Sequence, residues 1–346
     1  MDLYTPQVPA SAFHPNFRAL RETYTEFDRQ VVSEWAEGFV DRDDKFVNEF
    51  QTTFNSCFWE LYLFASLKEF GLAVDFSVSS PDFLVSGPCS PFCVEGTTAN
   101  SAEGEPKEWE SKASEFTKVR REPIVNMATI RLANAITSKF AHYQRVYASL
   151  GHVAERPFVL AIAPFEQPWF FVQNDQAMRR VLYAYDRPLL HFIEGSPRAL
   201  VVGHEHMRKI KKPSGATVPL GYFLNSHMAD ISAVIFSNTA TFGKVHALSK
   251  DPDPHVFFET LRYNIHGDQP THTLTQRADY IETLLDGLHV FHNPFAKFPL
   301  DAHLFCKPGV TQHTWVEEAP WPPFVTTHGA LIQRSVITMR PKPKIE

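Results

Sequence analysis

The fold is decided by one stretch of the chain, CFWELYLFASLKEFGLAVDFSVSSPDFLVSGPCSPFCVEGT, which covers residues 57–97. Apolar residues cover almost every helical direction in its first part, which predicts a buried helix. We expect this helix to run over residues 43–70 and to end at Gly71, because glycine is a common helix terminator. Short runs rich in β-forming residues follow at residues 71–76, 81–85 and 92–97.

The second and third of these runs are joined by SGPCSP, whose Gly and Pro favour a turn. If the hairpin is symmetric about the midpoint of residues 88 and 89, Asp82 lies opposite Glu95 and both side chains point to one face. A slip of one residue would separate the two acids. In the symmetric register Leu84, Cys93 and Thr97 share their face, and Phe83, Val85, Phe92 and Val94 point into a core.

Three acids in this stretch lie where negative charge is unfavourable. Glu60 is the only charged residue among residues 57–67, so its carboxylate loses hydration unless a cation or hydrogen bonds compensate. Asp82 and Glu95 repel each other if they are directly opposed. Carboxylate oxygens suit Mg²⁺ or Mn²⁺, and such an ion lowers the pKa of a bound water for phosphodiester cleavage. The alternative is that all three acids are simply exposed to water.

These residues resemble the motif of the PD-(D/E)XK nuclease superfamily. The chain has a Glu-bearing helix, then Pro81-Asp82, then Glu95-Gly96-Thr97, and a further helix at 123–150 and strand at 157–164. The resemblance covers residues 45–165 and extends at most to residue 240. It implies an α/β fold with a restriction-endonuclease-like core, in which an antiparallel hairpin and a mixed sheet are flanked by helices. It also implies that Glu60, Asp82 and Glu95 are catalytic metal ligands.

The chain departs from the family at Thr97, where the motif lysine should stand. In some branches of the family the basic residue moves to the following helix, and Lys139 is the candidate here. Arg131, Lys139 and Tyr143 lie eight and four residues apart, near one helix face. We expect Lys139 to be catalytic and Thr97, Arg131 and Tyr143 to contact nucleic acid. The alternative is a solvated helix face.

A basic run, MRKIKKP at residues 207–213, is the best candidate for contact with phosphates. Its cations are Arg208, Lys209, Lys211 and Lys212. Contacts of this kind are electrostatic and weaken as the salt concentration rises. A solvated loop is the alternative interpretation.

The rest of the chain divides, in this interpretation, into an N-terminal helical extension (1–44), the core (45–245) and a C-terminal elaboration (246–346). We expect a helix over residues 16–40 and an irregular C-terminal region around one helix at 276–288. Other expected elements are a helix at 174–186 and strands at 156–165, 199–203 and 231–238. We expect one extended domain and not two independent ones.

Composition excludes several classes of protein. A formal charge of −6 argues against a non-specific polyanion-binding coat, and four cysteines in 346 residues do not make a disulfide framework. No apolar run approaches the ~20 residues that cross a bilayer, and the N-terminus lacks a signal-peptide pattern. We therefore expect a cytoplasmic protein without a membrane partner, and we leave a homodimer open.

Other motifs carry less weight. His204 and His206 suggest zinc, but no third ligand stands at a recognisable spacing. His289, His292 and Asn293 faintly resemble an HNH nuclease, and we interpret them as a structural turn because Pro294 follows. Cys89 and Cys93 lack a second ligand pair, and His227 and Asp230 lack a nucleophile. The chain has neither a P-loop nor a dinucleotide-binding glycine motif.

The sequence therefore predicts a nuclease that uses Mg²⁺ or Mn²⁺ to hydrolyse phosphodiester bonds, with DNA as the expected substrate. A second hypothesis is a catalytically inactive nuclease fold that binds nucleic acid or protein. A third is an enzyme of another class with its site in the C-terminal region.

Overall fold

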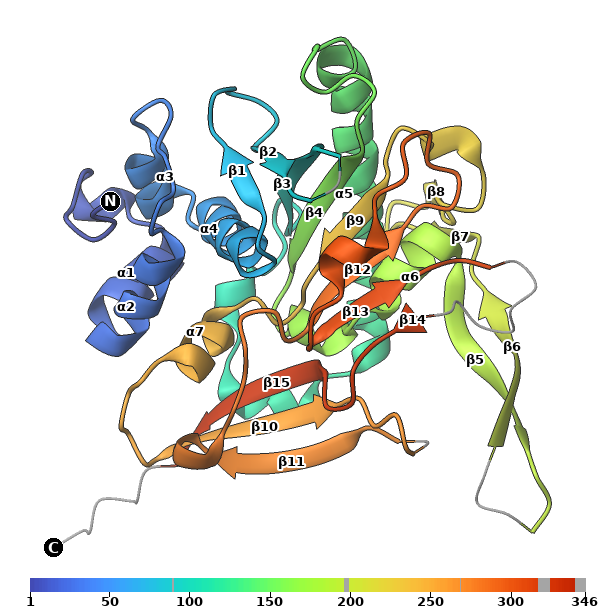
Figure 1. Cartoon of the computed structure of the whole chain (residues 1–346). Helices are drawn as coiled ribbons and strands as arrows, with labels where there is room; N and C mark the ends of the chain where they lie inside the picture. The colour runs from blue at the N-terminus through green and yellow to red at the C-terminus, as the bar shows by residue number, and fades with distance from the viewer. Residues whose placement is uncertain (89, 196–198, 268, 317–323, 340–346) are drawn as a thin grey trace, which may run out of the picture.

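One mixed sheet runs through the molecule (Figure 1), seen in a computed structural model that describes residues 1–88, 90–195, 199–267, 269–316 and 324–339. Its eight strands lie in the spatial order β1 (Ala73–Asp75), β2 (Phe83–Ser86), β3 (Phe92–Asn100), β4 (Phe158–Phe165), β9 (Ala233–Phe236), β12 (Leu288–His292), β13 (Val310–His313) and β14 (Phe324–Val325). Strands β1 to β3 are antiparallel neighbours, whereas β3, β4 and β9 run parallel. The α/β class expected from the sequence is therefore confirmed.

Helices cover both faces of the sheet. One hydrophobic core lies under α1 (Pro15–Glu22), α2 (Glu26–Trp35), α3 (Phe46–Thr52), α4 (Asn55–Glu69) and α7 (Phe242–Leu248). The other lies under α5 (Arg121–His142) and α6 (Gln176–Tyr183). All residues of β4 are buried, and alternate side chains enter the two cores. This double covering explains why β4 is a continuous apolar run in the sequence.

The β2–β3 hairpin has the register predicted from its symmetry. Phe83 pairs with Val94, Leu84 with Cys93 and Val85 with Phe92. The four side chains expected to point into a core, Phe83, Val85, Phe92 and Val94, are fully buried in the first core. Cys93 lies in the second core on the opposite face. The same register, continued by one residue, places Asp82 opposite Glu95.

Two of the long helices predicted from the sequence are interrupted. The expected helix at 16–40 is α1 and α2, which are separated where Thr25 starts α2 with a capping box shared with Asp28. The expected helix at 43–70 is α3 and α4. Helix α4 ends before Gly71, whose φ of +79° is the left-handed conformation that stops a helix.

The C-terminal region is more regular than the sequence predicts. Strands β10 (Val256–Arg262), β11 (Thr271–Gln276) and β15 (Leu331–Thr338) form a separate antiparallel sheet of three strands. Strands β12 to β14 belong to the central sheet, so that sheet crosses the expected boundary after residue 245. The helix predicted at 276–288 is wrong, because the segment holds only a short 3-10 turn at Arg277–Asp279 before β12 begins.

Two small hairpins complete the strands: β5 (Tyr185–Phe192) with β6 (Ala199–His206), and β7 (Lys209–Lys211) with β8 (Thr217–Pro219). Short helical turns are η1 (Ala10–Ala12), η2 (Glu108–Glu110), η3 (Ala113–Lys118), η4 (Tyr143–Tyr147, a π-helical turn), η5 (Phe170–Gln173), η6 (Ser226–Met228), η7 (Arg277–Asp279) and η8 (Ala302–Phe305). Within the described ranges, no helix combines the length and the apolar character that crossing a membrane requires.

A buried ion cluster fastens the three-stranded sheet to the rest of the fold. Glu282 accepts from Arg334 of β15 at 2.5 Å and pairs with Lys244 of α7. Both Lys244 and Glu282 have fully buried side chains. Such a cluster is sensitive to the loss of one member, because the remaining charge is then buried without compensation.

Candidate functional site

Glu95 is the most enclosed of the three predicted acids. It lies on β3 with 4% of its surface exposed. Its Oε1 accepts a hydrogen bond from Lys139 Nζ at 2.6 Å and another from the Tyr147 hydroxyl at 3.3 Å. Its Oε2 is buried and has no hydrogen-bond partner among the described residues. One carboxylate oxygen is thus neutralised, and the other is free to bind a ligand.

Lys139 reaches Glu95 from the helix that follows the hairpin. Its side chain extends from α5, retains 28% exposure and forms an ion pair with Glu95. The structure therefore brings a lysine to this acid although position 97 holds threonine. Thr97 stands two residues after Glu95 on β3 and is half-buried.

Asp82 is held next to Glu95 by the backbone of the neighbouring strand. Its Oδ2 accepts a hydrogen bond from the Gly96 N–H at 2.7 Å. A Cβ atom on Gly96 would stand only 3.3 Å from Asp82 Oδ2 and 3.4 Å from Leu63 Cδ1 of α4. The absence of a side chain at Gly96 therefore lets both the aspartate and the helix approach β3.

Glu60 lies on α4, which packs against β3 and β4. The neighbouring Trp59 is buried and donates its indole N–H to the Ala161 carbonyl of β4 at 3.0 Å, which fixes the helix against the sheet. The Glu60 side chain is only partly buried. It therefore stands beside the sheet with access to solvent.

The electrostatics of the acids show that they are neighbours. Burial, followed by the negative charge of Asp82, raises the pKa of Glu60 to about 8. Burial, followed by the charge of Glu95, raises the pKa of Asp82 to about 7, although the Gly96 N–H and Lys139 oppose this rise. Carboxyl groups with such pKa values favour the approach of a cation, because it would relieve both the desolvation and the repulsion.

The three acids do not form a compact three-ligand cluster. In the described residues, the only three side chains whose His, Cys, Asp or Glu donor atoms all lie within 4.8 Å of one another are Asp175, His289 and His313. The prediction that Glu60, Asp82 and Glu95 hold one or two metal ions stays a prediction.

Two neighbours of the acids were missed by the sequence reasoning. Arg42 lowers the pKa values of Glu60 and Asp82 through its charge, and it donates to the Val78 carbonyl at 2.6 Å. Tyr147 follows Lys139 by eight residues, close to two helical turns, and this spacing was the available signal for it. Arg42 lies in a segment without a motif, so its position depends on the fold.

The other two residues predicted on the helix at 123–150, Tyr143 and Arg131, have structural contacts. Tyr143, the first residue of η4, is 7% exposed and its ring packs 4.5 Å from that of Phe158 in the second core. Its contact with nucleic acid stays a prediction. Arg131 donates to the carbonyls of Asn100 and Ser101 at the end of β3. Its guanidinium therefore holds the strand end, and only its remaining N–H groups are available to a ligand.

The basic run forms part of the β7–β8 hairpin, whose first strand contacts α5. Arg208, Lys209 and Lys211 are exposed, and Lys212 is half-buried. The four cations therefore lie at the surface on the side of the sheet covered by α5. Their exposure is compatible with phosphate contact and equally with simple solvation.

His292, Asn293 and Asp230 of the weaker motifs have structural contacts. His292 hydrogen-bonds Gln312 Oε1 at 2.9 Å, and Asn293 donates to the Met228 and Ile231 carbonyls. Asp230 forms an ion pair with Lys297 at 2.7 Å. The His204 and His206 rings stand 4.2 Å apart on β6, and Cys89 lies outside the described residues.

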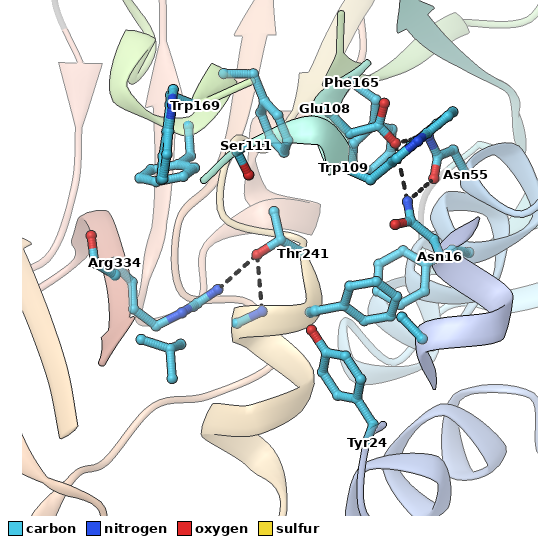
Figure 2. A pocket seen from close by; sticks show the side chains of 18 of the residues that line it. Asn16, Tyr24, Asn55, Glu108, Trp109, Ser111, Phe165, Trp169, Thr241 and Arg334 are labelled. Atoms are coloured by element: carbon cyan, nitrogen blue, oxygen red, sulfur yellow. Dashed lines mark hydrogen bonds between the residues drawn. The ribbon is translucent and has the colours of Figure 1, made fainter. Parts of the chain in front are cut away.

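A cavity of about 840 Å³ opens between the N-terminal helices and β15 (Figure 2). Aromatic side chains line it, including Tyr24, Trp109, Phe165 and Trp169. At one end Glu108 Oε1 accepts from Asn55 Nδ2 at 2.5 Å and from Asn16 Nδ2 at 3.0 Å. Glu60, Asp82 and Glu95 do not line this cavity, so it is distinct from the acidic site.

Comparison of the chain with models of known families, with curated proteins and with solved structures yields no match.

Proposed function

We propose that the protein is a divalent-metal-dependent nuclease that hydrolyses phosphodiester bonds, with DNA as substrate. The observation that carries the proposal is the group formed by Asp82, Glu95 and Lys139. One oxygen of the buried Glu95 is bound by the lysine and the other has no partner in the described structure. The aspartate beside it has a pKa raised to about 7 by burial and by the charge of Glu95.

The arrangement of elements supports a restriction-endonuclease-like core. The chain order α4, β1, β2, β3, α5, β4 combines an antiparallel hairpin with a parallel β3–β4 pair, and the two helices cover opposite faces. Asp82 directly precedes β2, and Glu95 lies within β3. This is the order of helix, strands and acids that the resemblance implies. Fold alone does not establish activity, so the proposal depends on the acids.

The donor set fits Mg²⁺ or Mn²⁺, because Glu95 Oε2 and the Asp82 carboxylate are hard oxygen ligands in a partly dry site. A bound ion of this kind lowers the pKa of a coordinated water and stabilises charge that develops on the phosphate. Lys139 orients Glu95 and places an ammonium group beside the acids. Glu60, with its pKa raised to about 8, is mostly protonated near neutral pH and is suited to donate a proton there.

DNA is proposed as the partner on electrostatic grounds. The exposed cations Arg208, Lys209 and Lys211 can contact phosphates, and Lys212 stands beside them. The thiols of Cys57, Cys93 and Cys306 are free, which suits the reducing cytoplasm as the proposed location. A homodimer would place two sites on the two strands of a duplex.

A non-catalytic nucleic-acid-binding module is the second candidate, and one observation favours it. The donor atoms of Glu60, Asp82 and Glu95 are not all within 4.8 Å of one another. The neutral Thr97, which stands where the motif lysine is expected, also favours this candidate. This candidate predicts salt-dependent DNA binding that survives substitution of the acids, with no cleavage in any metal ion.

Cleavage of supercoiled plasmid in Mg²⁺ or Mn²⁺ tests the proposal. Asp82→Ala and Glu95→Ala should abolish cleavage, and Lys139→Met should reduce it strongly. Asp230→Ala is the matched control, because Asp230 is an acid paired with a lysine outside the group. If all these variants cut as fast as the wild type, and EDTA has no effect, the assignment is wrong.

A further inference from the structure

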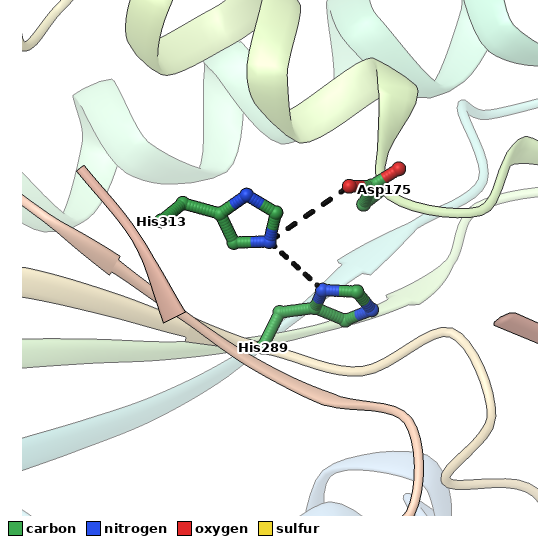
Figure 3. A group of neighbouring side chains, drawn as sticks. All are labelled: Asp175, His289 and His313. Carbon is green, nitrogen blue, oxygen red and sulfur yellow. Dashed lines mark hydrogen bonds and ion pairs between the residues drawn. The ribbon is translucent and has the colours of Figure 1, made fainter. Parts of the chain in front are cut away.

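Three buried side chains meet on the α6 side of the central sheet (Figure 3). Asp175 directly precedes α6, His289 belongs to β12 and His313 ends β13. His289 Nδ1 lies 3.0 Å from His313 Nε2, and His313 Nε2 lies 3.8 Å from Asp175 Oδ2. The three residues are far apart in the sequence, so only the fold brings them together.

The distances between these donors suit a four-coordinate ion. Zinc bonds to nitrogen and oxygen are about 2.0–2.1 Å long, which places neighbouring ligands of a tetrahedral ion about 3.3 Å apart. The observed distances of 3.0 Å and 3.8 Å lie on either side of that value. All three donor atoms lie within 4.8 Å of one another, so they surround one point that an ion could occupy after the side chains adjust.

The surroundings orient these donors. Arg179 Nη2 donates to Asp175 Oδ1 at 2.9 Å, which leaves Oδ2 turned toward the imidazoles. The Phe291 ring stacks 4.1 Å from that of His313 and fixes its plane. Hydrogen bonds that orient a ligating carboxylate and ring contacts that fix an imidazole plane are both features of metal sites in proteins. The other ring nitrogen of His313, Nδ1, is buried without a hydrogen-bond partner among the described residues, so the ring contact with Phe291 is what holds this imidazole.

We propose that Asp175, His289 and His313 bind one Zn²⁺ ion. Two imidazole nitrogens and one carboxylate oxygen favour Zn²⁺ over Mg²⁺, which prefers oxygen ligands. The ion would join the start of α6 to β12 and β13, and so fasten the C-terminal strands of the sheet to the helix beside them. A water molecule or another small ligand would occupy the fourth position. The site is independent of the proposed nuclease centre.

Metal titration of the whole chain tests this site. Protein stripped by a chelator and dialysed should bind one equivalent of Zn²⁺, and Co²⁺ should give the visible absorption of a four-coordinate complex without thiolate charge transfer. His289→Gln and His313→Gln should each weaken Zn²⁺ binding more than about tenfold. His292→Gln is the matched control, because His292 lies on the same strand and hydrogen-bonds Gln312 outside the trio.

The result can be distinguished from any metal binding at the acids. The double variant Asp82→Ala, Glu95→Ala should retain the full equivalent of Zn²⁺ and the Co²⁺ spectrum. Circular dichroism establishes whether each variant is folded. If a variant is unfolded, the Zn²⁺ stoichiometry of the wild-type protein still tests the proposal. Failure of wild-type protein to bind a stoichiometric ion, or equal binding by all three histidine variants, would overturn the proposal.

Discussion

Replacement of Glu60 by glutamine should stabilise the metal-free protein at alkaline pH. The folded protein raises the pKa of Glu60 from 4.5 to about 8, chiefly by burial and then by the charge of Asp82. A carboxyl with a raised pKa contributes stability at low pH, and that contribution is lost as the pH rises from about 4.5 through about 8. At pH about 9 the charged Glu60 therefore opposes folding, and the neutral glutamine does not.

The magnitude follows from the pKa change. A rise from 4.5 to about 8 sets an upper limit of about 5 kcal/mol, at about 1.4 kcal/mol for each pKa unit. Access of solvent to the partly exposed carboxyl reduces the expected gain to roughly 1–3 kcal/mol. The gain should shrink as the pH falls and disappear below 4.5, where Glu60 is protonated in both the folded and the unfolded states.

Urea denaturation in EDTA at several pH values measures this difference in the free energy of unfolding. Glu69→Gln is the matched control, since Glu69 is an exposed acid on the same helix, and it should change stability by less than about 0.5 kcal/mol. A Glu60→Gln variant that is less stable than the wild type at pH about 9 would refute the reasoning. So would a difference that does not depend on pH.

Four further predictions follow from the same structure. Saturating Mg²⁺, at about 100 times its dissociation constant, should stabilise the wild type by about 2.7 kcal/mol in thermal denaturation, and Asp82→Asn should lose this effect. Lys139→Met should lower the rate of plasmid cleavage about 10²-fold, measured under conditions where the variant is folded. Gly96→Ala introduces a Cβ 3.3 Å from Asp82 Oδ2 and should cost about 1–3 kcal/mol in urea denaturation. Lys244→Met removes one of the two cations that pair with Glu282 and leaves Arg334. It should lower the free energy of unfolding by about 3 kcal/mol.

Local patterns in the sequence were enough to predict the part of the fold that holds the acids. The register of β2 and β3 follows from a turn placed between two short apolar runs, because one slipped residue would expose the buried faces. Strand β4 was recognisable because burial on both faces makes every residue apolar. Lys139 was predicted from the resemblance, some branches of which carry the basic residue on the following helix, and Lys139 lies on that helix, α5.

Local sequence patterns do not specify contacts between segments that are distant in the chain. Strands β12, β13 and β14 hold only five, four and two residues, so their sequences carry no local period that separates them from irregular chain. Helical spacing predicts a nucleic-acid contact for Tyr143, because it specifies only the helix face. The packing of Phe158 against Tyr143 depends on the fold. Asp175 and His313 belong to no sequence motif. They lie close together only because of the order of strands in the sheet.

The amino-acid sequence alone determined the α/β class, the hairpin register and the acids placed on it, because these depend on side-chain period and turn chemistry over a few tens of residues. The tertiary structure alone decided which polar side chains meet. Lys139 and Tyr147 contact one oxygen of Glu95, Arg42 lies near Glu60, and two histidines lie beside Asp175. The physical reason is that burial and electrostatic interaction depend on distance in space, and separation along the chain does not specify that distance.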